Sequence, residues 1–169
     1  TTLSGGRIQI TINGESKEIE LNPEGSTNEE RLNSIARQIN QADSRVTASV
    51  IKIADNQYKL YLTSKETGIV NQMELADVGG DRVLRDLGIL DEDGAIANVA
   101  QAATDAEIEI NGDTSNPARR ASNKITDLIP GLTLTLKEEG TVTVGVELDQ
   151  AKIVQNVKAF VDAYNAVMD

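Results

Sequence analysis

Cysteine and histidine are both absent from the 169 residues of this chain. Their absence removes the thiolate and the imidazole, the usual nucleophiles and zinc ligands that titrate near neutral pH. A chain without cysteine cannot form disulfides, so the cysteine count does not assign a redox compartment. The absence does suit a protein that is exported unfolded through a narrow channel, where stray crosslinks would block passage.

Aromatic residues are scarce, with three tyrosines, one phenylalanine and no tryptophan. The hydrophobic residues, which make up 39% of the chain, are therefore mostly aliphatic. Cores of this kind are small, so we expect stability to depend on β-pairing and on neighbouring subunits.

Positive charge is also in short supply, because 16 basic residues face 27 acidic ones and the formal net charge is -11. Nucleic acid is not expected as a partner, since phosphate backbones demand clustered lysine and arginine. No apolar run approaches the roughly 20 residues that span a bilayer, so no membrane partner is expected. No signal peptide opens the chain, and we expect export without a cleavable signal.

Three short motifs resemble catalytic or ligand-binding sites, but each lacks a feature that such a site requires. Ser49 and Lys52 have the spacing of an acyltransferase pair, but they lie in an expected strand, where i and i+3 point to opposite faces. Residues 91–94 hint at a calcium loop, yet Ile89 and Ala100 would occupy its first and last ligand positions. The glycine pairs lack the lysine of a phosphate cradle. The sequence therefore predicts no enzyme, no catalytic residues, no cofactor and no metal.

A β-rich lobe is expected over residues 1–90. Alternating apolar residues from 7 to 13 indicate a half-buried strand. The Asn13-Gly14 pair tolerates the positive φ of a type I′ turn, so a return strand up to Leu21 should follow.

A helix should come next, because two overlapping capping boxes precede an apolar stripe. The boxes pair Ser26 with Glu29 and Thr27 with Glu30. The stripe, at helical spacing, consists of Leu32, Ile35, Ala36 and Ile39.

This lobe is completed by two further strands, 46–53 and 58–63, and by a short helix that ends at Gly88. Residues 91–104 are small, acidic and without a period, and are interpreted as a linker.

The second expected lobe, residues 105–148, repeats the order of the first. A strand ends in Asn111-Gly112, a short helical turn covers 122–129, and two alternating strands, 132–136 and 142–148, surround Glu139-Gly140. The expected fold class is α+β and β-rich: two small lobes of antiparallel hairpins, each with a short helix, and then an amphipathic C-terminal helix.

That last helix should cover residues 149–169, with Asp149 as its N-cap. One face is apolar, and such a face at the end of a chain suggests packing against a partner. The residues of this candidate assembly face are Ile153, Val157, Phe160, Tyr164 and Met168.

Arg119-Arg120 is the only adjacent basic pair and is too small for a nucleic-acid patch. It is a candidate salt-bridge site at a subunit interface, and an ordinary solvated pair is the alternative.

Several runs resemble one known family. The C-terminal half of the flagellar filament cap proteins (hook-associated protein two) is similar to three of these runs, residues 105–112, 120–137 and 157–166. A repeat that cap proteins share with flagellin inserts resembles three earlier runs, residues 32–40, 46–50 and 62–68. Pro117 and Arg119 depart from the family pattern. The resemblance covers most of the chain and corresponds to the central head domains plus the start of the C-terminal leg helix.

The resemblance implies a homo-oligomeric ring outside the bacterial cell, at the tip of the flagellar filament. Its partners would be other copies of itself and flagellin, which it would hold during folding and insertion. The first half alone fits a flagellin insert equally well. Two rival functions stay open: a surface-exposed flagellin or hook-junction domain, and an adhesin module for host mucin or glycan, for which the few aromatic residues offer little platform.

Overall fold

The computed structural model describes residues 3–145 and 150–168. By its internal contacts the chain forms two compact units, Thr1–Lys137 and Glu138–Asp169, which are described separately below. The lobe boundaries expected from the sequence, with a linker at 91–104, stay a prediction.

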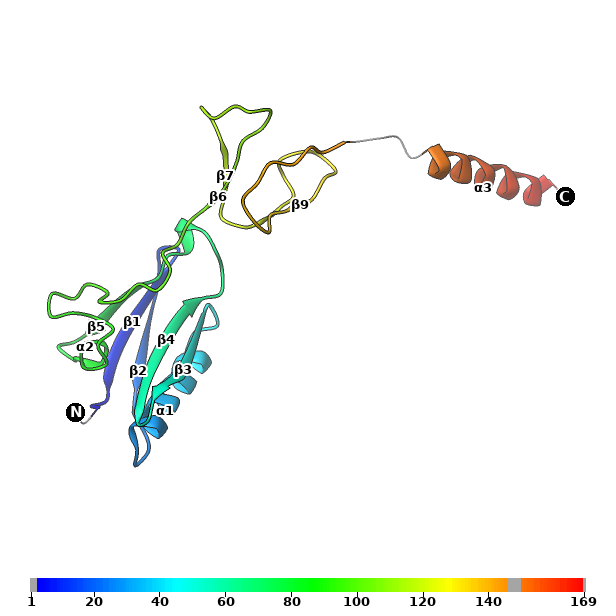
Figure 1. The fold of residues 1–169 in the computed structure, drawn as a ribbon. Coiled ribbons are helices and arrows are strands. Elements are labelled where there is room, and N and C mark those ends of the chain that lie inside the picture. The colour runs from blue at the N-terminus through cyan, green and yellow to red at the C-terminus, as the bar shows by residue number, and fades with distance from the viewer. Residues whose placement is uncertain (1–2, 146–149, 169) are drawn as a thin grey trace. The chain divides into compact units, whose positions relative to one another are not determined.

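A three-stranded antiparallel sheet with strand order β2-β1-β5 forms one layer of the first unit (Figure 1). Strand β1 (Gly6–Ile12) pairs with β2 (Glu15–Leu21) on one edge and with β5 (Glu74–Val78) on the other. Asn13 and Gly14 have φ values of 53° and 73°, as the expected hairpin turn requires. Strand β5 was not predicted from the sequence.

Helix α1 (Asn28–Ala42) begins at a capping box, as expected, and the box is the second of the two candidates. Thr27 is the N-cap, and the Glu30 carboxylate accepts hydrogen bonds from the backbone N–H groups of Ser26 and Thr27. These two bonds lower the pKa of Glu30. The Ser26–Glu29 box was therefore not the one used.

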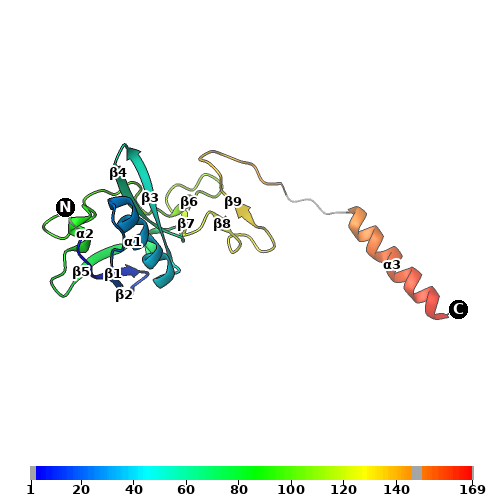
Figure 2. The same cartoon turned by 90° about the horizontal axis from the view of Figure 1, so that it is seen from below.

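Strands β3 (Val46–Ala54) and β4 (Gln57–Ser64) form the expected antiparallel hairpin, with Asn56 at φ 57° in its turn. Helix α1 packs against β3, β4 and β2, while the short helix α2 (Val83–Asp86) packs against β1 and β5 (Figures 1 and 2). A 3-10 turn, η1 (Ile69–Asn71), follows β4. The aliphatic core between these elements includes Ile8, Ile10, Leu21, Ile35, Ile39, Val46 and Leu84.

Part of the expected linker is ordered against this core. Leu90 is buried and bridges to Ile96, and the Asp91 side chain accepts a hydrogen bond from the backbone of Ala95. The backbone N–H of Ala97 also bonds to the carbonyl of Ile89, at 2.8 Å. Residues 89–97 therefore form a tight hydrogen-bonded turn.

The rest of the first unit contains only very short strands. Strand β6 (Ala106–Ile108) pairs with β7 (Ala118–Arg120), and β8 (Lys124–Ile125) pairs with β9 (Leu134–Thr135). Asn111 and Gly112 have the positive φ values expected of a turn.

Two details of the second lobe were wrong. The expected helical turn at 122–129 is replaced by β8, in which Ile125 is buried and pairs with Leu134. Tertiary pairing thus overrides a short helical pattern. Residues 141–145 form no strand, and the remainder of the expected strand, 146–148, lies outside the described residues.

The second unit contains helix α3 (Gln150–Met168), which confirms the expected C-terminal helix. Its proposed N-cap, Asp149, lies outside the described residues. The fold class is confirmed as mixed α+β and strand-rich, with antiparallel hairpins, a few short helices and a C-terminal helix.

Candidate assembly surfaces

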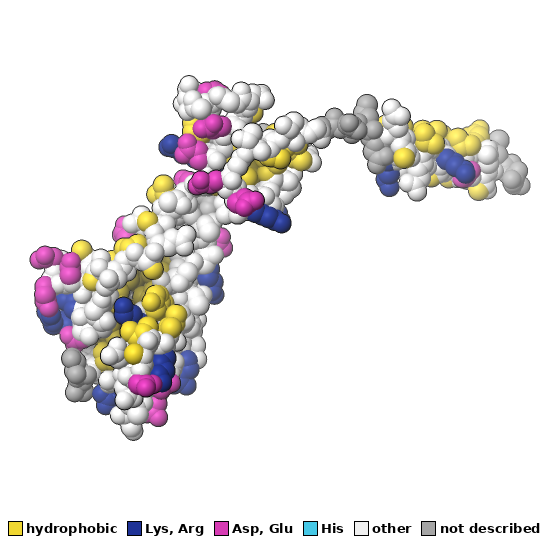
Figure 3. All heavy atoms as spheres, in the orientation of Figure 1, with side chains coloured by type: hydrophobic (Ala, Val, Ile, Leu, Met, Phe, Trp, Pro, Cys, Tyr) yellow, Lys and Arg dark blue, Asp and Glu magenta, His cyan; other side chains and the backbone are white. Residues whose placement is uncertain are grey.

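Helix α3 exposes the apolar face that the sequence predicts. Within its own unit, Phe160 is 71% exposed and Tyr164 57% exposed, and Ile153 and Val157 are also exposed. The side chain of Met168 lies outside the described residues. Figure 3 shows hydrophobic side chains along this helix, with basic ones between them. An apolar face of this kind is suited to packing against another helix.

Arg119 and Arg120 each pair with a carboxylate of the same chain. The Arg120 Nε lies 2.9 and 3.0 Å from the two carboxylate oxygens of Asp127, and this bonding lowers the pKa of Asp127. The Arg119 Nε lies 3.3 Å from a carboxylate oxygen of Glu107, across the β6–β7 pair. All four side chains are partly exposed, and a role between subunits stays a prediction.

The segment after β4 contacts the short-strand region directly. The Thr67 hydroxyl donates to the backbone carbonyl of Ala121 at 2.6 Å, and the backbone N–H of Ile69 donates to the Asp105 carboxylate at 2.8 Å. Between them Gly68, at φ 94°, lies so close to Ala121 that a Cβ at position 68 would overlap it. This junction could not be predicted from the sequence, because its partners are more than 35 residues apart.

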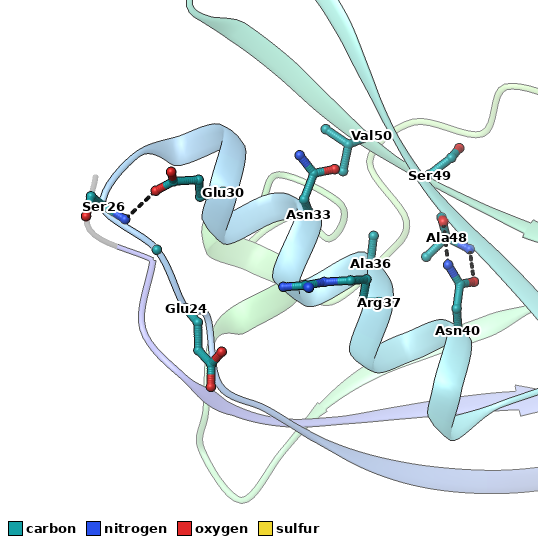
Figure 4. Close-up of a pocket in the computed structure, with 11 residues that line it drawn as sticks. Glu24, Ser26, Glu30, Asn33, Ala36, Arg37, Asn40, Ala48, Ser49 and Val50 are labelled. Atoms are coloured by element: carbon teal, nitrogen blue, oxygen red, sulfur yellow. Dashed lines mark hydrogen bonds between the residues drawn. The ribbon is translucent and has the colours of Figure 1, made fainter.

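A groove runs between helix α1 and the outer edge of strand β3 (Figure 4). Its volume is about 830 Å³, and its lining includes Asn33, Ala36, Arg37, Asn40 and Val50. At one end the Asn40 amide forms two hydrogen bonds with the backbone of Ala48, one to the N–H and one to the C=O, each 2.8 Å long. The side chain thus occupies the position that a neighbouring strand would take.

A second amide on α1 acts in the same way. The Gln38 side chain bonds to both the backbone N–H and the C=O of Asn22, which follows strand β2, at 2.8 Å each. Side-chain amides of helix α1 therefore bond to strand β3 and to the residue that follows strand β2. Neither amide was singled out from the sequence, since an exposed polar residue on a helix is ordinary.

The motifs considered for chemistry have structural roles instead. Lys52 pairs with Asp55 at 2.9 Å, and Glu92 pairs with Arg82 at 2.8 Å. Within residues 3–145 and 150–168, no group of three or more acidic residues is placed to hold a metal ion. None of the helices in the same ranges is long and apolar enough to cross a membrane.

These features describe a strand-rich module whose notable surfaces are an apolar helix face, a groove beside strand β3 and the contact between Gly68 and Ala121. The comparisons with known proteins agree with this class. Residues 103–169 match the family described as flagellar hook-associated protein 2 C-terminus. The chain is similar over its whole length to the flagellar hook-associated protein 2 of Salmonella typhimurium, at 34% identity over 173 residues.

Other relatives agree. The B-type flagellar hook-associated protein 2 of Pseudomonas aeruginosa is 31% identical over 97% of the chain. The crystal structure of the flagellar cap protein FliD from Escherichia coli superimposes with a TM-score of 0.74, at 28% identity, over 98% of this chain and 55% of that one. The FliD structure from Pseudomonas aeruginosa gives 0.66 over 98% of this chain and 76% of that one.

The chain belongs to the flagellar hook-associated protein 2 family, which the sequence resemblance anticipated. It spans about a third of the length of the curated relatives, 35% and 36% for the two named above. The solved Escherichia coli relative is described as a flagellar cap protein, and the matches favour this family over a flagellin domain or an adhesin module.

Proposed function

We propose that this chain is the head region and the beginning of the leg of a bacterial flagellar filament cap. The observation that carries the proposal is the similarity over 98% of the chain to a solved flagellar cap protein, with a TM-score of 0.74. In this role the protein is exported and acts outside the cell, at the filament tip.

The mechanism is steric and conformational, with no bond made or broken. Copies of the protein form a ring or plate that holds exported flagellin while it folds and inserts beneath the cap. The absence of cysteine and histidine from the sequence supports a role without catalysis.

Helix α3 supplies the apolar contacts that hold the copies together. Each chain carries a formal charge of -11, so several copies around one axis repel one another. Salt screens exposed charges over about 8 Å at physiological strength, which weakens this repulsion without removing it. The exposed side chains of Phe160 and Tyr164 offer the apolar area needed to offset it.

A segment exchange tests the proposal. The region of the Salmonella typhimurium relative that aligns with this chain is replaced by this chain, and filament growth is measured in cells that lack their own cap protein. We expect the hybrid to restore filaments and swimming. A control hybrid carries the original Salmonella segment, reinserted through the same joints. A hybrid that is exported normally but leaves flagellin unassembled in the medium contradicts the proposal.

A further inference from the structure

The groove between α1 and β3 lies along a strand edge that is only partly occupied. Strand β3 pairs with β4 on one side, and Asn40 takes the hydrogen bonds of Ala48 on the other. Outward-facing backbone groups alternate along an antiparallel strand, so those of Val50 and Lys52 face the same side as those of Ala48. Among residues 3–145, no side chain hydrogen-bonds to these groups.

The groove has the form that strand addition uses. In that mode an extended segment forms main-chain hydrogen bonds with a sheet edge, and alternate side chains enter the adjoining pockets. The walls include the small residues Gly25, Ala36 and Ala48, which leave room for a backbone. Figure 4 shows Asn33 of α1 and Val50 of β3 facing each other across the groove.

The charged residues that line the groove are one arginine and two glutamates. Arg37 of α1 (Figure 4) is exposed and forms no ion pair or hydrogen bond within the described ranges. Glu24 and Glu30 lie toward the N-terminal end of α1, where Glu30 is held by the helix cap. Arg37 is therefore the group in the groove that would attract the carboxylates of an acidic segment.

The chain itself contains a segment with the required chemistry. Residues 141–144 read Thr-Val-Thr-Val, an alternation typical of strands, yet they are in no strand. Val142 is 80% exposed and Val144 is 47% exposed. Glu138 and Glu139 precede them and would supply the carboxylates for Arg37.

We propose that residues 138–145 of a neighbouring copy add as a strand to the open edge of β3, in the groove beside α1. One of the two glutamates pairs with Arg37, and the valines pack toward Val50. Because the groove and the added segment are different surfaces, the contact is head-to-tail, and repeated head-to-tail contacts close into a ring when the rotation allows it. This inference rests on the self-association proposed above and names one of its contacts.

Cysteine trapping tests the contact on the whole chain, which has no native cysteine. One variant carries Asn33→Cys in the groove and a second carries Thr143→Cys in the segment, and the two are mixed under mild oxidation. We expect the mixed disulfide to form at least about tenfold faster than with a control variant, Lys59→Cys, whose exposed site on β4 lies outside the groove.

Charge reversal supplies the second arm. Arg37→Glu in the groove variant should slow trapping about fivefold, as expected for an exposed ion pair. Glu138→Arg with Glu139→Arg in the segment variant should then restore it. The change Lys59→Glu, of the same charge, should have no effect.

The inference is overturned if mixed trapping is no faster than the control, or if Arg37→Glu leaves it unchanged. It is also overturned if a chain that carries both cysteines forms a disulfide within itself rather than with a second copy. That result would mean that residues 138–145 bind the groove of their own chain. Ring formation by a protein of the relatives' full length is measured separately by sedimentation. Rings without specific trapping reject this contact alone, whereas the absence of rings rejects the proposed function.

Discussion

The buried Asp43 carboxylate accepts hydrogen bonds from two nitrogens of the Arg45 guanidinium, at 2.7 and 3.0 Å. Arg45 in turn donates to the backbone carbonyls of Ile12 and Glu15, at 3.3 and 3.0 Å. The pair thus ties the loop after α1 to the turn of the first hairpin, and bonding to Arg45 lowers the pKa of Asp43.

Replacing Asp43 with asparagine should lower the free energy of unfolding by about 2 kcal/mol, because hydrogen bonds to a charged group are lost at a buried site. Urea denaturation measures the change. The control is Asp55→Asn, in an ion pair whose carboxylate is 97% exposed, and it should change stability by less than about 0.5 kcal/mol. Equal effects at the two sites would contradict this role for Asp43.

The same pair predicts a pH dependence. The pKa of Asp43 is lower in the folded chain than its ordinary value of 3.8, so its contribution to stability is fully present above that value. The contribution should be lost as the pH falls through the lowered pKa of the folded state. Acid unfolding of the wild type and Asp43→Asn should therefore converge below that pH, and a constant gap between them would contradict the assignment.

The Asn40 amide should protect the edge of β3. Asn40→Ala removes both bonds to Ala48, so we expect a loss of about 1 kcal/mol in stability and faster hydrogen exchange at the Ala48 amide. Asn33→Ala, in the same groove but without a hydrogen bond, should leave both quantities unchanged. Unaltered exchange at Ala48 in Asn40→Ala would show that the amide does not protect this edge.

A side chain at position 68 should not fit in the contact between Gly68 and Ala121. Gly68→Ala places a Cβ against Ala121 and also strains a positive φ, so we expect the contact to open and the free energy of unfolding to fall by more than about 2 kcal/mol. Gly80→Ala is the matched control, because Gly80 has φ 88° but open space around its Cβ position. Limited proteolysis near residue 104 should accelerate in the first variant and much less in the second.

Added calcium or zinc should leave the melting temperature unchanged. The carboxylates of Glu92 and Asp91, in the one candidate loop, are already used by Arg82 and by the backbone of Ala95. A bound metal at a hundredfold excess over its Kd would raise stability by about 2.7 kcal/mol. An upward shift of that size in a thermal melt would contradict the account.

Local signals predicted most of the first lobe. The Asn13-Gly14 turn, the capping box at Thr27 and the strict alternation around Ile10 each specify backbone geometry over a few residues, and each is present in the structure. Strand β5 was missed because it is short and lies beside β1 only after some 60 intervening residues have folded.

The short-strand region was predicted poorly for a different reason. Its strands are two or three residues long, so no periodic pattern can develop, and Ile125 was assigned to a helical turn. The apolar face of α3 was predicted from its 3.6-residue period, whereas the amide of Asn40 and the junction at Gly68 depend on partners that spacing does not reveal.

In the proposed cap, the apolar face of α3 joins copies of an acidic structural protein. Sedimentation velocity of a protein of the relatives' full length, at low and at high salt, decides whether it does, with Phe160→Ser/Tyr164→Ser as the variant. We expect the wild type to form a ring that is more stable at high salt, because screening weakens the repulsion between chains of charge -11. The double variant should dissociate at both salt concentrations, while its far-UV circular dichroism keeps the β-rich signal. The present chain alone should be a monomer or a weak oligomer. A tight, salt-insensitive ring of the present chain, unaffected by the double substitution, would contradict the claim.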